Sequence, residues 1–188
     1  MERLIKHLCP LPEPVAQPVF IIVSGLPGTG KSYFSQKLAE KIPLVILESD
    51  DLRKVLFSRP AYSQEESSYL FRICHSLIES LLKKGIPLVL DATNLAERNR
   101  EYLYSISERL GIKLIIVRIV APPEVVQERL QSRAHQPASR SDADWEVYRR
   151  MESEVEQITR NHHVVDTSRD ITPVIDRIAK EIKRERRR

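Results

Sequence analysis

Three of the chain's five glycines fall within residues 25–32, which read GLPGTGKS and directly follow the apolar run VFIIVS. A lysine and a serine close this segment, and an amphipathic pattern with Phe34, Leu38 and Ile42 comes after it. Glycines allow the backbone to curl so that successive N–H groups point inward, where they attract an anion. A helix that begins at such a loop adds partial positive charge. The segment is therefore suited to hold phosphate.

The spacing from Gly25 to Ser32 matches the P-loop pattern G-x-x-x-x-G-K-[ST] in full. In this pattern the lysine reaches the β- and γ-phosphates of a nucleotide, and the hydroxyl ligates Mg²⁺. We assign these roles to Lys31 and Ser32, and we predict ATP and Mg²⁺ as cofactors. The residues predicted to surround the nucleotide are Gly25, Leu26, Pro27, Gly28, Thr29, Gly30, Lys31, Ser32 and Tyr33.

Carboxylates follow two other apolar runs. Asp91 lies near the end of the run over 86–92, where its carboxylate could hold the shell of a Mg²⁺ ion through water. Asp50 follows the run over 44–49, where it could accept the proton of an attacking hydroxyl. For each residue the alternative role is to cap the next helix. We predict metal binding for Asp91 and proton transfer for Asp50.

Two features favour transfer to an acceptor over hydrolysis. Asp91 is followed by Ala92 and Thr93, so the glutamate that many hydrolysing P-loop ATPases carry there is missing, and no Asn-Lys-x-Asp string for guanine occurs. Arg53 lies three residues after Asp50 and therefore projects on the same side of the helix. Its planar guanidinium suits an anionic or phosphate-bearing acceptor. The sequence therefore predicts a kinase that acts on a hydroxyl group.

A second set of arginines lies in ERLQSRAHQPASRSDADWEVYRRM, residues 128–151. Arg129 and Arg133 share one helix face, the string HQPAS predicts a short turn, and Arg140 precedes a new helix start. This pattern predicts a helical lid over about residues 129–145, which closes over the nucleotide and brings these three arginines to it. Surface ion pairs with neighbouring acidic residues are the alternative role.

The elements that must position these residues alternate along the chain. Runs rich in Val, Ile and Leu predict strands buried on both faces at 19–24, 44–49, 86–92, 113–120 and 163–167. Helical patterns occupy 31–41, 50–58, 64–84, 96–110, 122–134, 142–159 and 172–185. Such alternation predicts an α/β fold with a parallel five-stranded sheet, helices on both faces and ligands at the carboxyl ends of the strands. The expected fold is a three-layer P-loop NTPase fold with a helical lid.

The chain resembles the small P-loop kinases related to the kinase domain of phage polynucleotide kinase. Chloramphenicol phosphotransferase and zeta toxins are more distant members of the group. The resemblance covers about residues 19–170 and rests on GLPGTGKS, SDDLR, DATNLAERNR and ERLQSR followed by SDADWEVYRRM. It implies transfer of the γ-phosphoryl group of ATP to a hydroxyl, which belongs to a nucleic-acid end or to a small molecule.

The resemblance also implies a role for each motif residue. Asp50 would be the general base, and Arg53 would contact a phosphate of the acceptor. Asp91 would order the metal or the acceptor. Arg133 would stabilise the transferring phosphoryl group, and Arg129 would lie near the nucleotide base. Lys31 completes the predicted catalytic set.

The string TNLAERNR belongs to the acceptor side in this resemblance. Asn94, Arg98 and Arg100 could line that side, although Arg98 and Arg100 suit a solvent-facing helix equally well. Two alternatives to polynucleotide-kinase-like activity stay open. One is a kinase for the hydroxyl of a small metabolite or antibiotic, and the other is a nucleotide-binding regulatory module with little transfer activity.

Length and composition bound the remaining expectations. The chain has 188 residues and a net charge of +4, so it is of single-domain size and its charge says little about partners. We expect residues 1–18, with four prolines, to be an extended or loose leader, 19–185 the kinase domain, and 183–188 a basic tail. Cys9 and Cys74 form no disulfide framework. No apolar run nears the ~20 residues that span a membrane, and no signal peptide is evident, which predicts a cytoplasmic protein without a membrane partner.

Overall fold

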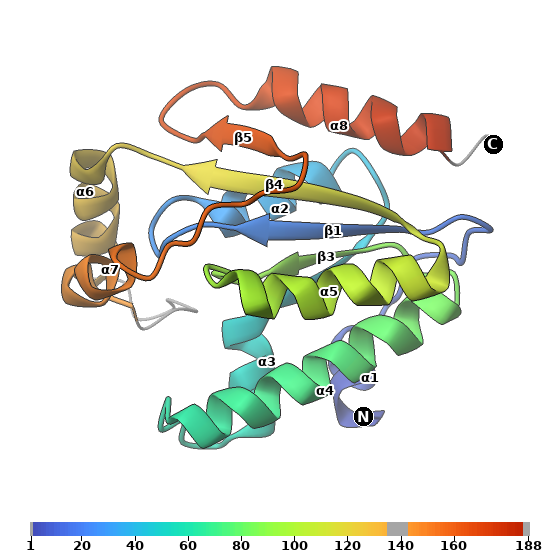
Figure 1. Ribbon diagram of the computed structural model, residues 1–188, viewed down its shortest axis with the longest axis horizontal. Coiled ribbons are helices and arrows are strands. Elements are labelled where there is room, and N and C mark those ends of the chain that lie inside the picture. Colours follow the sequence, from blue (N-terminus) through green and yellow to red (C-terminus); the bar gives the residue numbers. More distant parts are fainter. Residues whose placement is uncertain (1, 135–142, 186–188) are drawn as a thin grey trace.

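The computed structural model describes residues 2–134 and 143–185. Its five strands form one sheet in the order β2-β3-β1-β4-β5, and all neighbouring strands are parallel. In Figure 1 the strand arrows point toward one edge, at which helices α6 and α7 lie. The strands are β1 (Val19–Ser24), β2 (Val45–Glu48), β3 (Leu88–Asp91), β4 (Lys113–Val120) and β5 (His163–Asp166).

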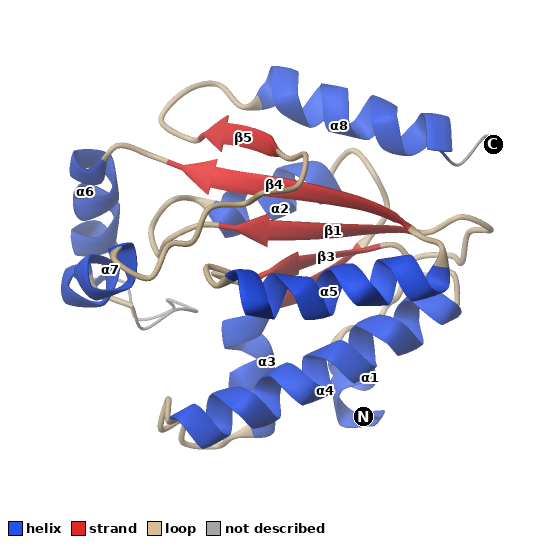
Figure 2. Ribbon diagram, in the orientation of Figure 1, coloured by secondary structure: helices blue, strands red, loops and turns tan. Residues whose placement is uncertain are grey.

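Helices cover both faces of the sheet (Figure 2) and account for the three layers that the sequence predicts. Their bounds are α1 (Glu2–His7), α2 (Lys31–Ala39), α3 (Ser49–Leu56), α4 (Gln64–Lys83), α5 (Glu97–Leu110), α6 (Pro123–Ala134), α7 (Trp145–Glu152) and α8 (Thr172–Glu185). All five predicted strands are confirmed, as is the α/β class. None of the helices within the described ranges is long and apolar enough to cross a membrane.

Strand β1 shows why its sequence is apolar throughout. Phe20 and Ile22 belong to the core that α1, α3, α4 and α5 complete on one face. Val19, Ile21 and Val23 belong to the core that α2 and α8 complete on the other face. All five side chains are fully buried, because successive residues of a strand point to opposite faces and both faces are covered.

The expectation of a loose leader is wrong for its first part. Residues Glu2–His7 form helix α1, and Leu4 is only 1% exposed in the core beneath α4 and α5. Ile5 packs against the same core, and the N–H of Val15 donates to the carbonyl of Gly85 (2.8 Å). The prolines follow α1, so they do not interrupt it, and apolar burial holds this segment to the sheet layer.

The second lid helix is shorter than predicted. We expected a helix over 142–159, but α7 ends at Glu152. Beyond it the N–H of Glu156 donates to the carbonyl of Leu95 (3.2 Å) instead of continuing the helix. The chain is thus tied to the segment after β3, and these tertiary hydrogen bonds override the local helical pattern. The predicted turn of the lid lies outside the described residues.

Candidate active site

The phosphate-binding loop connects β1 to α2. Gly28 and Gly30 have positive φ angles of 78° and 94°, a region that side chains disfavour. A Cβ atom on Gly30 would lie 2.9 Å from the hydroxyl oxygen of Thr167, in the loop after β5. The hydroxyl of Thr29 donates to the carbonyl of Leu26 (2.8 Å) and closes the turn. The loop therefore has the tight backbone course that its glycines predict.

Lys31 lies over this loop and faces two carboxylates. Its ammonium donates to the carbonyl of Leu26 (3.0 Å). Burial lowers the pKa of Lys31, and the negative charges of Asp91 and Asp50 act in the opposite direction. Arg133 adds a further lowering effect on the pKa of Lys31, so its guanidinium also lies near the loop. The four charged groups converge on one small region.

Strand register explains why the carboxylates meet. Asp91 at the end of β3 lies opposite Val23 of β1 on one side and Glu48 of β2 on the other. Two residues after Glu48, Asp50 occupies the first turn of α3. Because parallel strands end at one edge, this register brings Asp50 and Asp91 to the mouth of the loop that contains Lys31.

Asp91 has the properties of a metal-shell residue. It is 5% exposed, and its Oδ2 atom has no hydrogen-bond partner within the described part of the chain. Burial raises the pKa of Asp91, while Lys31 and the Ser32 hydroxyl oppose that effect. An unpartnered buried oxygen beside Ser32 fits a Mg²⁺ ion. The described residues contain no cluster of three acidic, histidine or cysteine side chains for a metal, so nucleotide phosphates and water would complete the shell.

A cleft of about 980 Å³ unites these groups. It begins at the phosphate-binding loop, passes Asp50 and Asp91, and continues between α4, α5 and α7. The predicted residues that line it are Pro27, Gly28, Gly30, Lys31, Ser32, Tyr33, Asp50, Arg53, Asp91, Asn94, Arg129 and Arg133. Gly25, Leu26, Thr29 and Arg98 do not line the cleft, and Arg140 lies outside the described residues.

The two described lid arginines make different contacts. Arg129 donates to both the hydroxyl and the carbonyl of Thr167 (2.8 Å each), and the Thr167 hydroxyl donates to the carbonyl of Thr29. This chain of bonds joins α6 to the phosphate-binding loop and to the loop after β5. Arg133 donates to the carbonyl of Ala143 (3.0 Å) just before α7. Arg129 therefore braces the nucleotide side, and Arg133 connects the two lid helices.

The lid has its own small core. Val126 and Leu130 of α6 pack with Tyr148 of α7, and Leu26 of the phosphate-binding loop packs against them. The rings of Trp145 and Tyr148 stack with centroids 4.8 Å apart. The two helices of the predicted lid are thus packed directly on the phosphate-binding loop.

Arg53 lies on the acceptor side in an ion pair that the sequence does not reveal. Its guanidinium pairs with the carboxylate of Glu66 on α4, and its Nη2 atom donates to the hydroxyl of Ser67 (3.2 Å). The ring of Tyr62 lies 4.9 Å from the guanidinium carbon. This guanidinium therefore already has an anionic partner. The predicted contact of Arg53 to an acceptor phosphate stays a prediction.

The string TNLAERNR after β3 contains three predicted site residues, and the structure places each of them differently. Asn94 has a positive φ of 47° and is 3% exposed; its amide donates to the carbonyl of Val23 (2.7 Å). Arg98 is exposed and points to no cleft, whereas the neighbouring Asn99 lines it. Arg100 is fully buried, so the solvent-facing alternative is wrong for it. Its guanidinium binds backbone carbonyls on both sides, including those of Asn94 (2.8 Å) and Gln157 (3.0 Å).

The sequence does not identify several residues that line the cleft. Phe71, Cys74 and His75 of α4, Leu103 of α5 and Met151 of α7 also line the cleft. Each lies on a helix face whose apolar spacing predicts core packing, and the pattern does not show where a core opens to a ligand. Only the polar Asn99, beside Arg98, offered a local signal.

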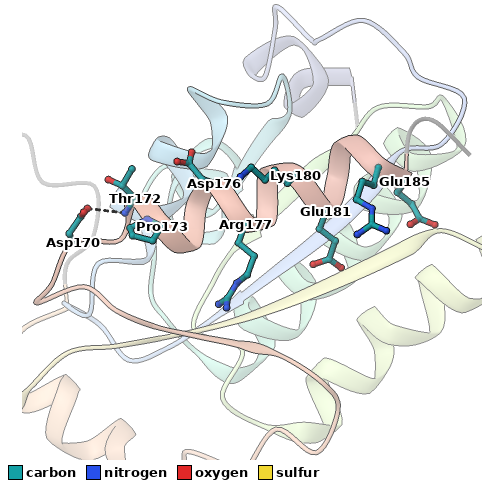
Figure 3. A pocket seen from close by; sticks show the side chains of 9 residues that line it. Asp170, Thr172, Pro173, Asp176, Arg177, Lys180, Glu181 and Glu185 are labelled. Atoms are coloured by element: carbon teal, nitrogen blue, oxygen red, sulfur yellow. Dashed lines mark hydrogen bonds between the residues drawn. The ribbon is translucent and has the colours of Figure 1, made fainter.

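A second hollow, of about 880 Å³, lies along α8 on the other side of the sheet (Figure 3). Its side chains alternate in charge, and several carboxylates have partners. Asp176 pairs with Lys41 (3.1 Å), Glu181 pairs with Lys113 (3.0 Å), and Asp170 accepts from the N–H of Thr172 (2.9 Å). This pattern is typical of a solvated helix face, and we assign it no function.

A P-loop between a buried strand and a helix, with a carboxylate at the neighbouring strand end and arginines from a helical lid, defines a P-loop kinase fold. The AAA domain family matches residues 20–158 of the chain. The chain therefore belongs to this family, AAA_33, and the resemblance to small P-loop kinases is confirmed.

Individual relatives agree with this class. The L-seryl-tRNA(Sec) kinase of Methanococcus maripaludis is 28% identical over 116 residues, which are 59% of this chain and 44% of that protein. This chain thus matches less than half of that relative's length. A proposed kinase from Chloroflexus aurantiacus has a TM-score of 0.70 at 24% identity, over 87% of this chain and 98% of that one. A chain of the Pnkp1/Rnl/Hen1 RNA repair complex has a TM-score of 0.63 at 20% identity, over 74% and 44%.

Proposed function

We propose that the protein is an ATP-dependent kinase that transfers the γ-phosphoryl group of ATP to a hydroxyl acceptor. The observation that carries this proposal is the meeting of Asp50, Asp91 and Lys31 in one cleft that extends beyond the phosphate-binding loop. A nucleotide binder without transfer activity needs only the loop end of this cleft. The rest of the cleft lies beside Asp50, where an acceptor hydroxyl would have to bind.

Each group has a role in the proposed transfer. Loop N–H groups and Lys31 hold the β- and γ-phosphates, and Ser32 and Asp91 hold Mg²⁺, which offsets phosphate charge when bound. The carboxylate of Asp50 accepts the acceptor's hydroxyl proton as that oxygen forms its bond to the γ-phosphorus. The bond from this phosphorus to the β–γ bridging oxygen breaks, and ADP leaves. Arg133 offsets charge on the transferring group.

A lid serves this reaction because it keeps water away from the γ-phosphorus. Hydrolysis and transfer compete for the same phosphorus, and closure over the cleft favours the bound alcohol. The lid core beside Leu26 positions α6 for this role. The glutamate that would activate water is replaced by Ala92 after Asp91, which favours transfer further.

The hydroxyl acceptor is supported by the relatives as well as by the cleft. A kinase for seryl-tRNA and a protein of an RNA repair complex suggest an alcohol on a nucleic acid, in keeping with polynucleotide-kinase-like activity. A small-molecule alcohol is the second candidate, and the environment of Arg53 favours it, as argued below.

A label-transfer screen tests the proposal. The protein is incubated with γ-labelled ATP and Mg²⁺ and with a panel of alcohols and 5′-hydroxyl oligonucleotides, and label is followed in acceptor and in free phosphate. We expect label in at least one acceptor, at a rate well above hydrolysis, and none with Lys31→Met. Nucleotide binding with label only in free phosphate, whatever alcohol is present, contradicts a kinase.

A further inference from the structure

The only cation from α3 to line the acceptor side of the cleft is already neutralised. Arg53 and Glu66 form an ion pair in which the two side chains are 11% and 8% exposed. Ser67 and the ring of Tyr62 occupy two more sides of the guanidinium. A phosphate could gain the bidentate face of Arg53 only by displacing Glu66, which would leave a buried carboxylate without its partner.

Glu66 is held in its charged form. Burial alone would raise the pKa of Glu66, but the N–H of Ala61 (2.7 Å) and the Arg53 guanidinium more than offset this, so its pKa lies below the ordinary value. At neutral pH the carboxylate is ionised, and the pair carries no net charge. The pairing therefore persists over the pH range in which a kinase works.

Apart from acidic residues and Arg150, the cleft wall that continues past this pair is uncharged. It consists mainly of apolar side chains, namely Leu70, Phe71, Cys74, Leu95, Leu103 and Met151. Burial raises the pKa of the Cys74 thiol to about 12 and lowers the pKa of His75, so both are neutral near pH 7. Glu48 and Asp50, close to Arg53 in the sequence, add only negative charge to the cleft, and Arg150 in α7 and Glu154 after it are exposed and opposite in sign. A polyanion would find no net attraction here.

Two buried polar atoms nevertheless lack partners. The Nε–H of Arg53 and the Oδ1 atom of Asn94 have none in the described ranges, and both residues are buried and line the cleft. One is a donor and the other an acceptor. Such atoms are costly unless a ligand or water pairs with them. A neutral hydroxyl compound that reaches these atoms would donate to Asn94 or accept from Arg53 without displacing Glu66.

We propose that the acceptor is an uncharged alcohol with an apolar or ring-shaped body, and that Glu66 keeps Arg53 from binding a phosphate. This inference rests on the proposed kinase activity and narrows its substrate class. It assigns Glu66 as a specificity-determining residue. An acceptor with a phosphate beside its hydroxyl, such as a nucleic-acid 5′ end, would be disfavoured by the same pair.

A binding experiment tests the role of Glu66 without need of turnover. The protein is saturated with a non-hydrolysable ATP analogue and Mg²⁺, which fill the nucleotide side, and is titrated calorimetrically with cytidine and with cytidine 3′-monophosphate. We expect the wild type to bind the phosphorylated compound no more tightly than cytidine. Glu66→Gln should raise affinity for the phosphorylated compound by about tenfold or more, because it releases a charged donor for the phosphate.

Glu65→Gln is the matched control, since Glu65 precedes Glu66 on α4 but is exposed. It should change neither affinity by more than about twofold. A wild type that prefers the phosphorylated compound by tenfold overturns the inference. So does a folded Glu66→Gln protein, judged by its melting temperature and analogue binding, that gains no affinity for it.

If Glu66→Gln does not fold, label transfer by the wild type tests whether the acceptor is uncharged. The acceptors are matched pairs: cytidine and cytidine 3′-monophosphate, glycerol and glycerol 1-phosphate, glucose and glucose 6-phosphate. Faster labelling of the neutral members supports the inference, and faster labelling of the phosphorylated members overturns it while leaving the kinase intact. Absence of label from the whole panel contradicts both the inferred acceptor class and the proposed kinase activity. Nucleotide binding without transfer would then indicate a nucleotide-binding module.

Discussion

Beside the phosphate-binding loop Asp91 is buried and Lys31 is half-buried, and loss of solvent shifts the pKa of each toward its neutral form. Each charge partly offsets the shift of the other. Within the described residues, the Oδ2 atom of Asp91 has no hydrogen-bond partner. In the proposed complex, a metal ion would supply positive charge at Asp91 and the nucleotide phosphates would supply negative charge at Lys31, so binding would offset the effect of burial on both pKa values.

The raised pKa of Asp91 predicts a pH-dependent metal effect. Asp91 protonates at a higher pH than an ordinary carboxyl, and the protonated form cannot hold the metal shell. As pH falls, the gain in ADP affinity that Mg²⁺ provides should shrink, and this loss should begin at a higher pH than an ordinary carboxyl would give, as measured by calorimetry with and without Mg²⁺. In Asp91→Asn the gain should be small at every pH. A wild-type gain that is constant over this range contradicts the assigned role.

Gly30 allows a second test at the scale of one residue. Its φ of 94° and the 2.9 Å approach of Thr167 leave no room for a Cβ, so Gly30→Ala must distort the loop. We expect nucleotide affinity to fall by about tenfold or more. Gly111→Ala is the control: its φ is 62°, but nothing lies within 4 Å, so it should cost only about 1 kcal/mol of stability and no affinity. Equal affinity loss in both variants would show that the effect is not local.

At the scale of elements, the segment after β3 is held by one side chain from α5. Arg100 binds the carbonyls of Asn94, Leu95, Glu156 and Gln157 and pairs with Glu97. It thereby fixes the cleft wall to the chain beyond α7. A cation in this position satisfies several buried carbonyls at once, which no apolar side chain can do.

Arg100→Met should therefore destabilise the fold by about 2–4 kcal/mol, because it leaves buried carbonyls without donors. Urea unfolding measures this difference. Arg98→Met, two positions earlier on the same helix, should change the free energy of unfolding by less than about 0.5 kcal/mol, since Arg98 is exposed. Similar values for the two variants would mean that the carbonyl contacts add nothing.

These two arginines show how far the sequence could predict the site. Strands 19–24 and 113–120 match β1 and β4 to the residue, because short runs rich in Val, Ile and Leu that follow Pro18 or Gly111 favour buried strands. The P-loop residues follow from spacing alone. In contrast, nothing in TNLAERNR distinguishes an exposed Arg98 from a buried Arg100, since the difference arises from carbonyls more than fifty residues away. The Arg53–Glu66 pair cannot be predicted from the sequence either, because it depends on how α3 and α4 pack together.

At the scale of the whole molecule, the sheet separates two cores that share strand β1. The N-terminal helix α1 completes one of them and reaches helix α3, where His7 pairs with Asp51 (2.6 Å). Segments from both ends of the described chain thus cover the sheet. The proline-containing stretch joins α1 to β1 and is part of the fold rather than an appendage.

The buried position of Leu4 allows the contribution of α1 to the stability of the fold to be measured. Leu4→Ala should lower the free energy of unfolding by about 2–4 kcal/mol, because it leaves a cavity in a core where Leu4 is 1% exposed. Lys6→Ala in the same helix should have an effect below about 0.5 kcal/mol, since Lys6 is exposed. Chemical unfolding of both variants gives the comparison. An unchanged stability of Leu4→Ala would mean that α1 does not stabilise the core.

The most direct measurement of the central claim compares two adjacent carboxylates. Asp50 lines the cleft beside Lys31, whereas Asp51 does not line it and pairs with His7. Label transfer from ATP to the best acceptor is measured for Asp50→Asn and Asp51→Asn, together with nucleotide affinity. We predict that Asp50→Asn retains nucleotide binding and loses at least about a hundredfold in transfer rate, while Asp51→Asn stays within about threefold of the wild type. Transfer by Asp50→Asn at the wild-type rate would contradict the account.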